Sequence, residues 1–323
     1  MGLEGRVGLV GMVGLVGLAG VLGPVARPDR FALRGQQVPV FRAGVDLVHV
    51  GITVTDRQGI LVTGLQMGDF DLYEDGVKQT LQYFSAGDAP SGGRNPALHL
   101  GVLLDVSDSM ADEVRFMRTA AIKFLNTLTE AVDVTVVDFD TEVRAARYGQ
   151  AEFARLVERI RQQKTNGMTA LYDAIGVYLD GASSQEGRKV MLLYTDGGDT
   201  RSALRLNELV DLLKASDVTV YAVGAVERQS ASAGERARSI LQRIADATGG
   251  RAFFPTSLEQ LDRVYGTVVA EIRAQYTLGY VSTNGRGDGA WRRIELRTPG
   301  AKGRALKLRS RKGYYARYRK PPG

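Results

Sequence analysis

Four near-continuous apolar runs limit the folds that this chain can adopt. They are LHLGVLLDV (98–106), VDVTVVDF (132–139), KVMLLYT (189–195) and VTVYAVGA (218–225). Such runs are typical of strands buried on both faces of a parallel sheet. Helical patterns separate and follow them, at 112–130, 151–163, 169–184, 203–215, 235–247 and 257–273. This alternation predicts a doubly wound, mostly parallel α/β sheet with helices on both faces, and TEVRAARYG after Asp140 is expected to add a short antiparallel edge.

Alternating segments flank this α/β region on both sides. VDLVHVGITVTD (45–56), ILVTGL, DFDLYEDG and VKQTLQYF precede it, and QYTLGYVS (275–282), WRRIELRT (291–298) and ALKLRSRKGYY (305–315) follow it. Their period of two indicates half-buried strands. Because the N-terminal set is too short to bury two faces alone, we expect both sets to pair into one small β-sandwich.

The N-terminal stretch Val7–Ala26 carries no charge and follows Arg6. A charged start, an apolar run and a small residue at its end resemble a secretory signal, and the length also suits one membrane-spanning helix. We therefore expect an exported chain that is periplasmic, secreted or anchored to the cell envelope. The expected divisions are a signal peptide or anchor (1–26), a linker (27–41), a small β unit (42–86), a linker (87–96), the α/β domain (97–272), a C-terminal β segment (273–316) and a basic tail (317–323).

Composition excludes several classes of function. Cysteine is absent, which excludes disulfides, thiolate zinc sites and cysteine nucleophiles. The net charge of +6 is local, because residues 301–323 hold nine Lys or Arg and the rest of the chain is at −3. We therefore expect no nucleic-acid partner. The two histidines, His49 and His99, fall in expected strands and leave a serine hydrolase without a base.

Polar side chains follow the expected strands where ligands bind in doubly wound sheets. Asp105, Ser107 and Ser109 end the first apolar run, Asp196 ends the third, and Thr169 opens a helix. All five offer oxygen, which predicts a site for one divalent cation, with Mg²⁺ favoured and Mn²⁺ or Ca²⁺ open. At most two carboxylates offset the cation, so it retains the capacity to take a carboxylate from a partner.

These residues also have ordinary structural interpretations. The serines, the threonine and Asp105 are suited to capping helices, and Asp196 with two following glycines is suited to a turn. Two further acids, Asp199 and Asp173, are expected to contact the metal ligands rather than the metal itself, or to fix the loops. Three others are expected to be solvated or at a sheet edge: Asp108, Asp138 and Asp140.

The D-x-S-x-S motif, the distant threonine and the T-D-G of residues 195–197 together resemble the metal-ion-dependent adhesion site of von Willebrand factor type A domains. That resemblance covers about residues 97–272, and the flanks 41–85 and 275–316 are similar to those of bacterial exported "VWFA-related" proteins. It implies a non-enzymatic adhesion or complex-assembly module whose protein partner presents an Asp or Glu carboxylate. Met168 departs from the pattern, because a glycine commonly precedes this threonine, and the shape of that loop is therefore in question.

Two other functions stay open. A haloacid dehalogenase-type phosphotransferase also ends its first strand with a catalytic Asp, but it needs a second carboxylate where this chain has Ser107. A structural scaffold with a degenerate metal site is the other. The tripeptide Arg286-Gly287-Asp288 lies in a Gly-rich loop and is expected to be ordinary loop sequence.

Overall fold

The computed structural model describes residues 47–87, 96–227, 229–299 and 305–318, all within one unit, Gly44–Gly323. The expected signal or anchor (1–26) and the first linker (27–41) lie outside the described residues. Among the helices of the described residues, none is long and apolar enough to cross a membrane.

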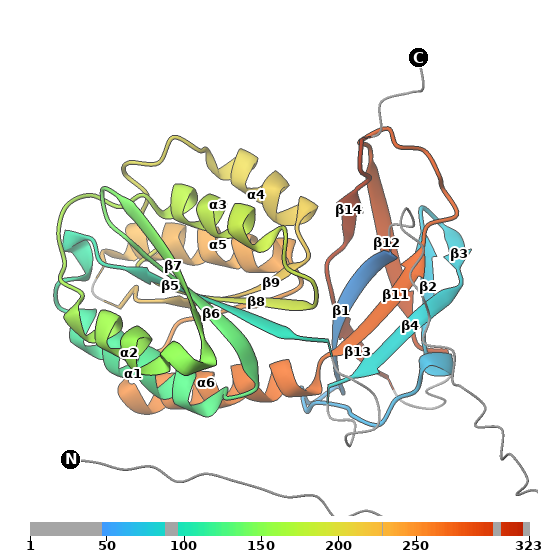
Figure 1. Cartoon of the computed structure of the whole chain (residues 1–323), viewed down its shortest axis with the longest axis horizontal. Coiled ribbons are helices and arrows are strands. Elements are labelled where there is room, and N and C mark those ends of the chain that lie inside the picture. The colour runs from blue at the N-terminus through green and yellow to red at the C-terminus, as the bar shows by residue number, and fades with distance from the viewer. Residues whose placement is uncertain (1–46, 88–95, 228, 300–304, 319–323) are drawn as a thin grey trace, which may run out of the picture. The chain divides into compact units, whose positions relative to one another are not determined.

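A six-stranded sheet forms the centre of the α/β domain (Figure 1). Its order is β10 (Arg251–Phe253), β9 (Val218–Gly224), β8 (Arg188–Thr195), β5 (Leu98–Asp105), β6 (Ala131–Phe139) and β7 (Val143–Gly149). All pairings are parallel except β6 with β7, so the expected doubly wound sheet and its antiparallel edge are confirmed. Because the chain goes from β5 to β6 on one side and later to β8 on the other, the strand order reverses between β5 and β8.

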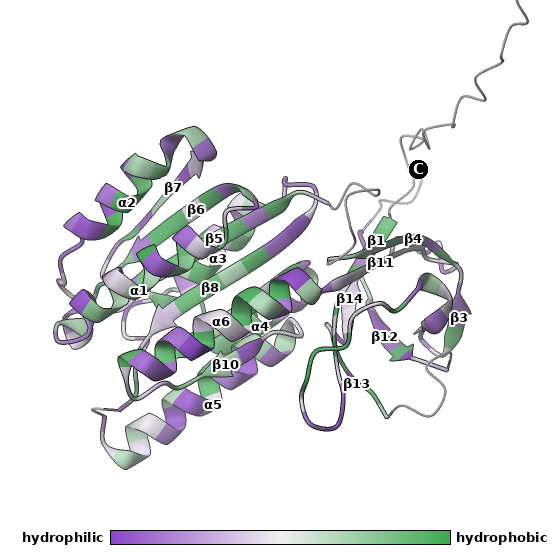
Figure 2. Ribbon diagram, turned by 90° about the horizontal axis from the view of Figure 1, so that it is seen from below, coloured by the Kyte–Doolittle hydropathy of each residue, from purple (hydrophilic) through white to green (hydrophobic). Residues whose placement is uncertain are grey.

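Helices cover both faces of this sheet, as predicted. One apolar core lies under α1 (Val114–Thr127), α2 (Phe153–Gln162) and α6 (Leu258–Ala274). The other lies under α3 (Leu171–Ala182), α4 (Leu206–Ala215) and α5 (Ala231–Ala247). Figure 2 shows hydrophobic central strands and helices that combine apolar with polar positions, the pattern of amphipathic helices packed on a buried sheet. Three short 3-10 helices complete the set: η1 (Met67–Asp69), η2 (Asp108–Met110) and η3 (Gln150–Glu152).

The flanking segments form two four-stranded sheets, which confirms the expected β-sandwich from both ends of the chain. One sheet has the order β13 (Lys307–Arg309), β1 (Leu47–Thr55), β11 (Tyr276–Val281) and β4 (Leu81–Ala86). The other has the order β14 (Gly313–Tyr315), β12 (Trp291–Arg297), β2 (Asp71–Glu74) and β3 (Val77–Gln79). Their shared core includes Ile52, Leu72 and Tyr280, all fully buried.

Two details of the expected strands are wrong. ILVTGL forms a single bridge between Leu61 and Thr55 instead of a strand, because the chain turns at Gly64, where φ is +77°. The short strand β10 was not predicted, since three residues give no clear alternation.

Arginine side chains join the sandwich to the ends of three helices. Arg311 is buried and donates to Ser216 O at the end of α4, 3.2 Å away, and to His49 O in β1. Arg309 donates to Gly249 O just after α5, at 2.9 Å, and pairs with Glu271 in α6. Cations at helix carboxyl ends complement the helix dipole and bond carbonyls that the helix leaves without a partner. The sandwich is therefore fixed to the α/β domain by directional contacts.

Gly101 in β5 gives a test of how tightly the sheet is packed. A Cβ at this position would lie 2.2 Å from the Tyr178 ring of α3, so Gly101→Ala is expected to lower the free energy of unfolding by about 1–3 kcal/mol in denaturant titrations. Gly181→Ala, also involving α3 but with open space around the new Cβ, is the control and is expected to be neutral or stabilising by about 0.5–1 kcal/mol. Equal effects of the two substitutions would contradict this packing.

Candidate metal centre

Three loops meet at the carboxyl ends of β5 and β8, where the strand order reverses. The Asp108 amide donates to Gly167 O at 3.0 Å and the Asn166 amide to Val106 O at 2.8 Å, which joins the loop after β5 to the loop before α3. The Thr200 amide donates to Thr169 O at 2.9 Å, which joins that second loop to the one after β8. The Thr195 hydroxyl, at the end of β8, donates to Asp105, at the end of β5, and so connects the third loop back to the first. The fold thus brings all three sequence pieces to one place.

Asp105, Ser107 and Ser109 form a continuous line of oxygen atoms. Ser107 Oγ donates to Asp105 Oδ1 at 2.5 Å and lies 3.1 Å from Ser109 Oγ. Ser107 stands at the N-cap position of η2, yet its side chain makes no capping hydrogen bond. The helix-cap interpretation of this serine is therefore not supported.

Thr169 and Asp196 lie beside this line, on the two neighbouring loops. Thr169 precedes Ala170, the N-cap of α3, so it is not the cap of that helix. Asp196 Oδ1 accepts from the Gly198 amide at 2.8 Å, and the Asp196 charge raises the pKa of Asp105. The three loops therefore carry the five predicted ligands at one end of the sheet, with direct oxygen contacts among Asp105, Ser107 and Ser109.

The two carboxylates of this site have no cationic partner among the described residues. Asp105 is fully buried and Asp196 is 8% exposed, while Ser109 is exposed. Burial raises the pKa of Asp105 to about 7, although hydrogen bonds from Ser107 and Thr195 oppose the shift. Buried carboxylates in proteins are normally paired with a cation or hold a metal. The arrangement is a negatively charged, oxygen-lined site that opens to solvent at Ser109.

Asp173 and Asp199 hold the loops around the site. Asp173 accepts from the Ala203 and Leu204 amides at 2.9 and 3.0 Å, and Asp199 accepts from the Tyr172 amide at 3.2 Å and from Ser202 Oγ at 2.6 Å. Both tie α3 to the loop after β8. Their oxygens are engaged by donors from these segments.

The expectation that Asp138 and Asp140 are solvated or edge residues is wrong in one respect. Both lie next to the edge strand β7, but they are 2% and 6% exposed. Arg144 Nε lies 2.6 Å from Asp138 and Arg144 Nη2 lies 2.8 Å from Asp140, and Arg159 also bonds Asp138. These arginines lie in β7 and α2, and alternation within one strand does not reveal such partners. Asp108 is exposed, as expected.

Thr195 is a site residue that the sequence reasoning missed. Its hydroxyl donates to Asp105 Oδ2 at 2.6 Å and accepts from the Gly197 amide at 3.1 Å. The β5–β8 register, in which Leu104 faces Tyr194, brings Asp105 level with Thr195. The sequence feature that could have identified Thr195 is its position directly before Asp196. Gln229, which donates to Asp196 O at 2.9 Å, has no such signal.

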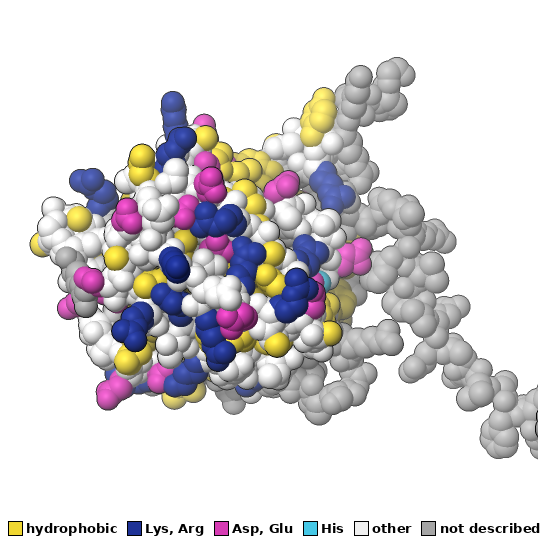
Figure 3. Space-filling model, turned by 60° about the vertical axis from the view of Figure 1, so that its left-hand side comes forward, with side chains coloured by type: hydrophobic (Ala, Val, Ile, Leu, Met, Phe, Trp, Pro, Cys, Tyr) yellow, Lys and Arg dark blue, Asp and Glu magenta, His cyan; other side chains and the backbone are white. Residues whose placement is uncertain are grey.

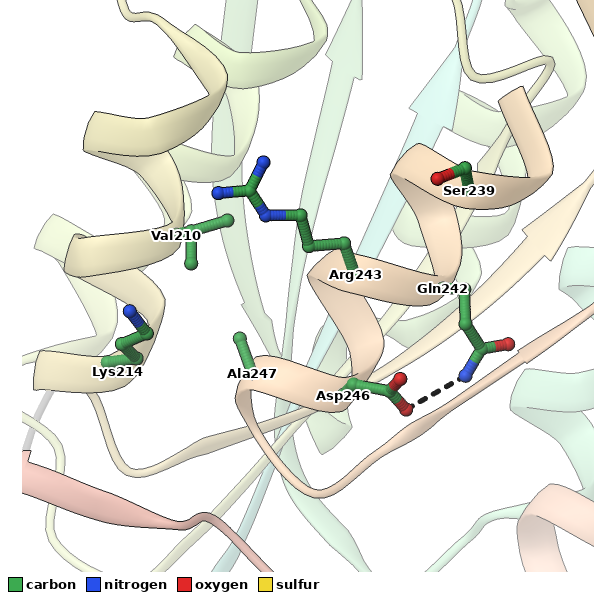
Figure 4. A pocket seen from close by; sticks show the side chains of 7 residues that line it. All are labelled: Val210, Lys214, Ser239, Gln242, Arg243, Asp246 and Ala247. Carbon is green, nitrogen blue, oxygen red and sulfur yellow. Dashed lines mark hydrogen bonds between the residues drawn. The ribbon is translucent and has the colours of Figure 1, made fainter. Parts of the chain in front are cut away.

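A recess lies apart from this site, between α4 and α5 (Figure 4). It has a volume of about 500 Å³ and is lined by Val210, Lys214, Arg243 and Asp246, among others. None of the predicted ligands lines it. Arg243 is engaged with Asn207 at 2.8 Å and Lys214 with Asp211 at 3.2 Å.

Among the described residues, no group of three or more His, Cys, Asp or Glu forms a metal site. The five predicted ligands comprise two carboxylates and three hydroxyls, so they do not include three residues of these types.

A family model matches the α/β domain. Residues 99–267, just over half of the chain, match the model of the von Willebrand factor type A domain. No curated protein matches the chain.

Several solved structures are similar. A von Willebrand factor type A structure from Catenulispora acidiphila is 15% identical, with 85% of this chain and 76% of that chain covered and a TM-score of 0.46. The pilus adhesin SpaC from Lactobacillus rhamnosus GG is 10% identical, with 79% and 49% covered and a TM-score of 0.46, so the chain spans about half of its length. The vWF domain of the type V pili tip protein Mfa5 from Porphyromonas gingivalis is 11% identical, with 56% and 97% covered and a TM-score of 0.44.

The buried Asp105 carboxylate predicts a pH dependence of stability in metal-free protein. Its pKa rises from 3.8 to about 7 on folding, so between these values the folded state holds a proton that the unfolded state has lost. The free energy of unfolding is therefore expected to fall as pH rises from 4 to 7, by up to roughly 1.4 kcal/mol per pH unit from this group.

Asp105→Asn should remove that component, so the difference in unfolding free energy between variant and wild type should grow toward pH 7 and then level off. Denaturant titrations in the presence of a chelator measure this difference, and Asp108→Asn is the control. A difference between Asp105→Asn and wild type that stays constant with pH would contradict the prediction.

Proposed function

Since the chain belongs to the von Willebrand factor type A domain family, we propose that it is a non-catalytic protein-binding module whose partner is captured in a divalent-cation-dependent way. The proposed ligands are Asp105, Ser107, Ser109, Thr169 and Asp196. Mg²⁺ is the proposed ion, because all five donors are oxygen atoms and hydroxyls outnumber carboxylates.

The observation that carries this proposal is the pair of buried carboxylates without a cation. Asp105 has its charge removed from water and no Lys or Arg beside it among the described residues, and Asp196 adds like charge nearby. A purely structural site would be expected to replace Asp105 by a neutral residue, since burying an unpaired charge destabilises a fold. A bound cation removes that cost and is therefore the natural counterpart of this arrangement.

The residues of the chain would orient the site and leave it open on one side. Thr195 and Ser107 each donate a hydrogen bond to Asp105 and so fix its two oxygens. The exposed Ser109 lies at the mouth, where a partner has access. A bound Mg²⁺ would supply the electrophile for a carboxylate of the partner, since only two ligands of the chain carry negative charge.

Catalysis is not part of the proposal. Ser107, two residues after Asp105, is bonded to that carboxylate and to Ser109, and a serine is not an acid that protonates a phosphate-ester leaving group. The proposed setting is the cell envelope or beyond, on the basis of the uncharged segment Val7–Ala26.

Calorimetric titration tests the metal site directly. Wild-type protein is expected to bind one Mg²⁺ or Mn²⁺, and Asp105→Ala and Ser107→Ala are expected to weaken binding at least tenfold, because each removes an oxygen of the line. Asp108→Ala removes an exposed carboxylate one residue away and should leave the affinity unchanged. Absence of divalent binding at millimolar metal would leave the structural scaffold as the better interpretation.

Partner capture from the native envelope fraction tests the function. Capture is expected with Mg²⁺, and to be lost with chelator or in Ser107→Ala. Hydrolysis of phosphate esters by the wild type that Asp105→Ala abolishes would overturn the proposal in favour of a phosphotransferase.

A further inference from the structure

Charges of both signs are mixed on the surface of the α/β domain. Figure 3 shows Lys and Arg side chains interspersed with Asp and Glu over the face that it brings forward. A mixed surface of this kind does not set up the single-sign field that steers a charged ligand. The features that distinguish the candidate metal centre therefore lie in its buried atoms.

The loop between β9 and α5 packs against the turn that carries Asp196. The Ala225 amide donates to Thr195 O at 2.9 Å, and Gln229 Nε2 donates to Asp196 O, also at 2.9 Å. β9 lies on the far side of β8 from β5. The turn after β8 is therefore held from both sides, by Asp105 through the Thr195 hydroxyl and by this loop.

Asp196 is oriented at two points. Its backbone oxygen accepts from Gln229, and Oδ1 of its side chain accepts from the Gly198 amide at 2.8 Å, while Oδ2 accepts no hydrogen bond from the described residues. At Gly197, where φ is +81°, a Cβ would lie 2.9 Å from the Ala237 Cβ of α5. The turn is thus closely packed, and one carboxylate oxygen of Asp196 is left for a cation.

The side-chain amide of Gln229 has one orientation that satisfies its contact with Asp196. The amide nitrogen donates and the amide oxygen accepts, whereas a backbone oxygen can only accept. Nε2 must therefore face Asp196 O, and Oε1 takes the other side of the amide group. The two ends of this amide consequently meet different surroundings.

Gln229 Oε1 is buried and has no donor from the chain. It is inaccessible to solvent and accepts no hydrogen bond from any described residue. The other buried side-chain atoms without a partner in this part of the chain are hydroxyls or arginine Nε atoms, so Oε1 is the one that can only accept. Buried acceptors are nearly always paired. This oxygen therefore fits a donor that comes from outside the chain.

The side chain of Gln229 is not needed to close its loop or to begin α5. Ser230 is the N-cap of α5 and accepts from the Ala233 amide at 3.4 Å. The Gln229 backbone amide donates to Val226 O at 3.3 Å, which closes the loop through the main chain. The side chain instead contacts Asp196. Helix capping therefore does not account for this glutamine.

A cation at the predicted ligands would bring donors of the required kind. Mg²⁺ prefers near-octahedral coordination and usually keeps several of its water molecules in protein sites. The predicted ligands do not complete an octahedral shell, so water fills the remainder until a partner binds. Side chains that contact the groups bound to a metal orient the site and raise its affinity.

We propose that Gln229 is a positioning residue of the metal centre, whose amide nitrogen holds Asp196 and whose buried oxygen accepts a hydrogen bond from water bound to the cation. This inference rests on the proposed function, because that water comes with the metal. The loop between β9 and α5 is then a fourth loop of the site, and it responds to the cation through one side chain.

Calorimetric titration of the full chain with Mg²⁺ tests this inference. Gln229→Met, which keeps the length of the side chain and removes both amide atoms, should weaken binding about tenfold. Gln242→Met is the matched control and should leave the affinity unchanged, because Gln242 is an exposed glutamine of α5 that bonds Asp246 at 2.8 Å. Without metal, the melting temperature of Gln229→Met should lie within about 4 °C of the wild type, since one neutral hydrogen bond is lost.

Hydrogen exchange in the wild type separates positioning from a purely structural role. Saturating Mg²⁺ should slow exchange of the Gln229 side-chain amide protons roughly threefold or more, because a hydrogen bond to Oε1 fixes the amide group. The side-chain amide of Gln242 should exchange at the same rate with and without Mg²⁺. NMR on the wild-type protein measures both rates, so the result does not depend on the stability of a variant.

Two results would overturn this inference alone. One is equal Mg²⁺ affinity of Gln229→Met and wild type, which together with a lowered melting temperature would give the glutamine a structural role only. The other is side-chain exchange at Gln229 that Mg²⁺ does not change. Absence of Mg²⁺ binding to the wild type would instead remove the proposed function, and this inference with it.

Discussion

The hydrogen bond from Thr195 to Asp105 crosses the point where the sheet reverses its strand order, and the rest of the site depends on it. It ties the ends of β5 and β8 together at 2.6 Å and presents a carboxylate in a place that water does not reach. From there Ser107 and Ser109 extend the line of oxygens toward solvent.

Much of the fold and of the candidate site could be predicted from the sequence, for physical reasons. Buried parallel strands have few tolerable residues, so their apolar runs were visible, and the ends of such strands are where polar motifs stand out. The D-x-S-x-S spacing located the first loop because three side chains in one turn need no tertiary information. The position of Thr169 beside that loop followed from the family pattern rather than from periodicity.

What escaped prediction depends on pairs distant in sequence. Asp138 is neutralised by Arg159, 21 residues away, and no local pattern reveals such a partner. Thr195 contacts Asp105 across 90 residues through strand register.

The sandwich has a consequence for how the chain reaches its native state. Its strands β1 to β4 precede the α/β domain, and β11 to β14 follow it, so β1 (Leu47–Thr55) cannot pair with β11 (Tyr276–Val281) until about 220 further residues have been made. The early strands emerge from the ribosome with open edges and an uncovered apolar face. Edges of this kind recruit other chains. Only when the last 50 or so residues, which hold β11 to β14, have been made can the sandwich cover this face and pair these edges.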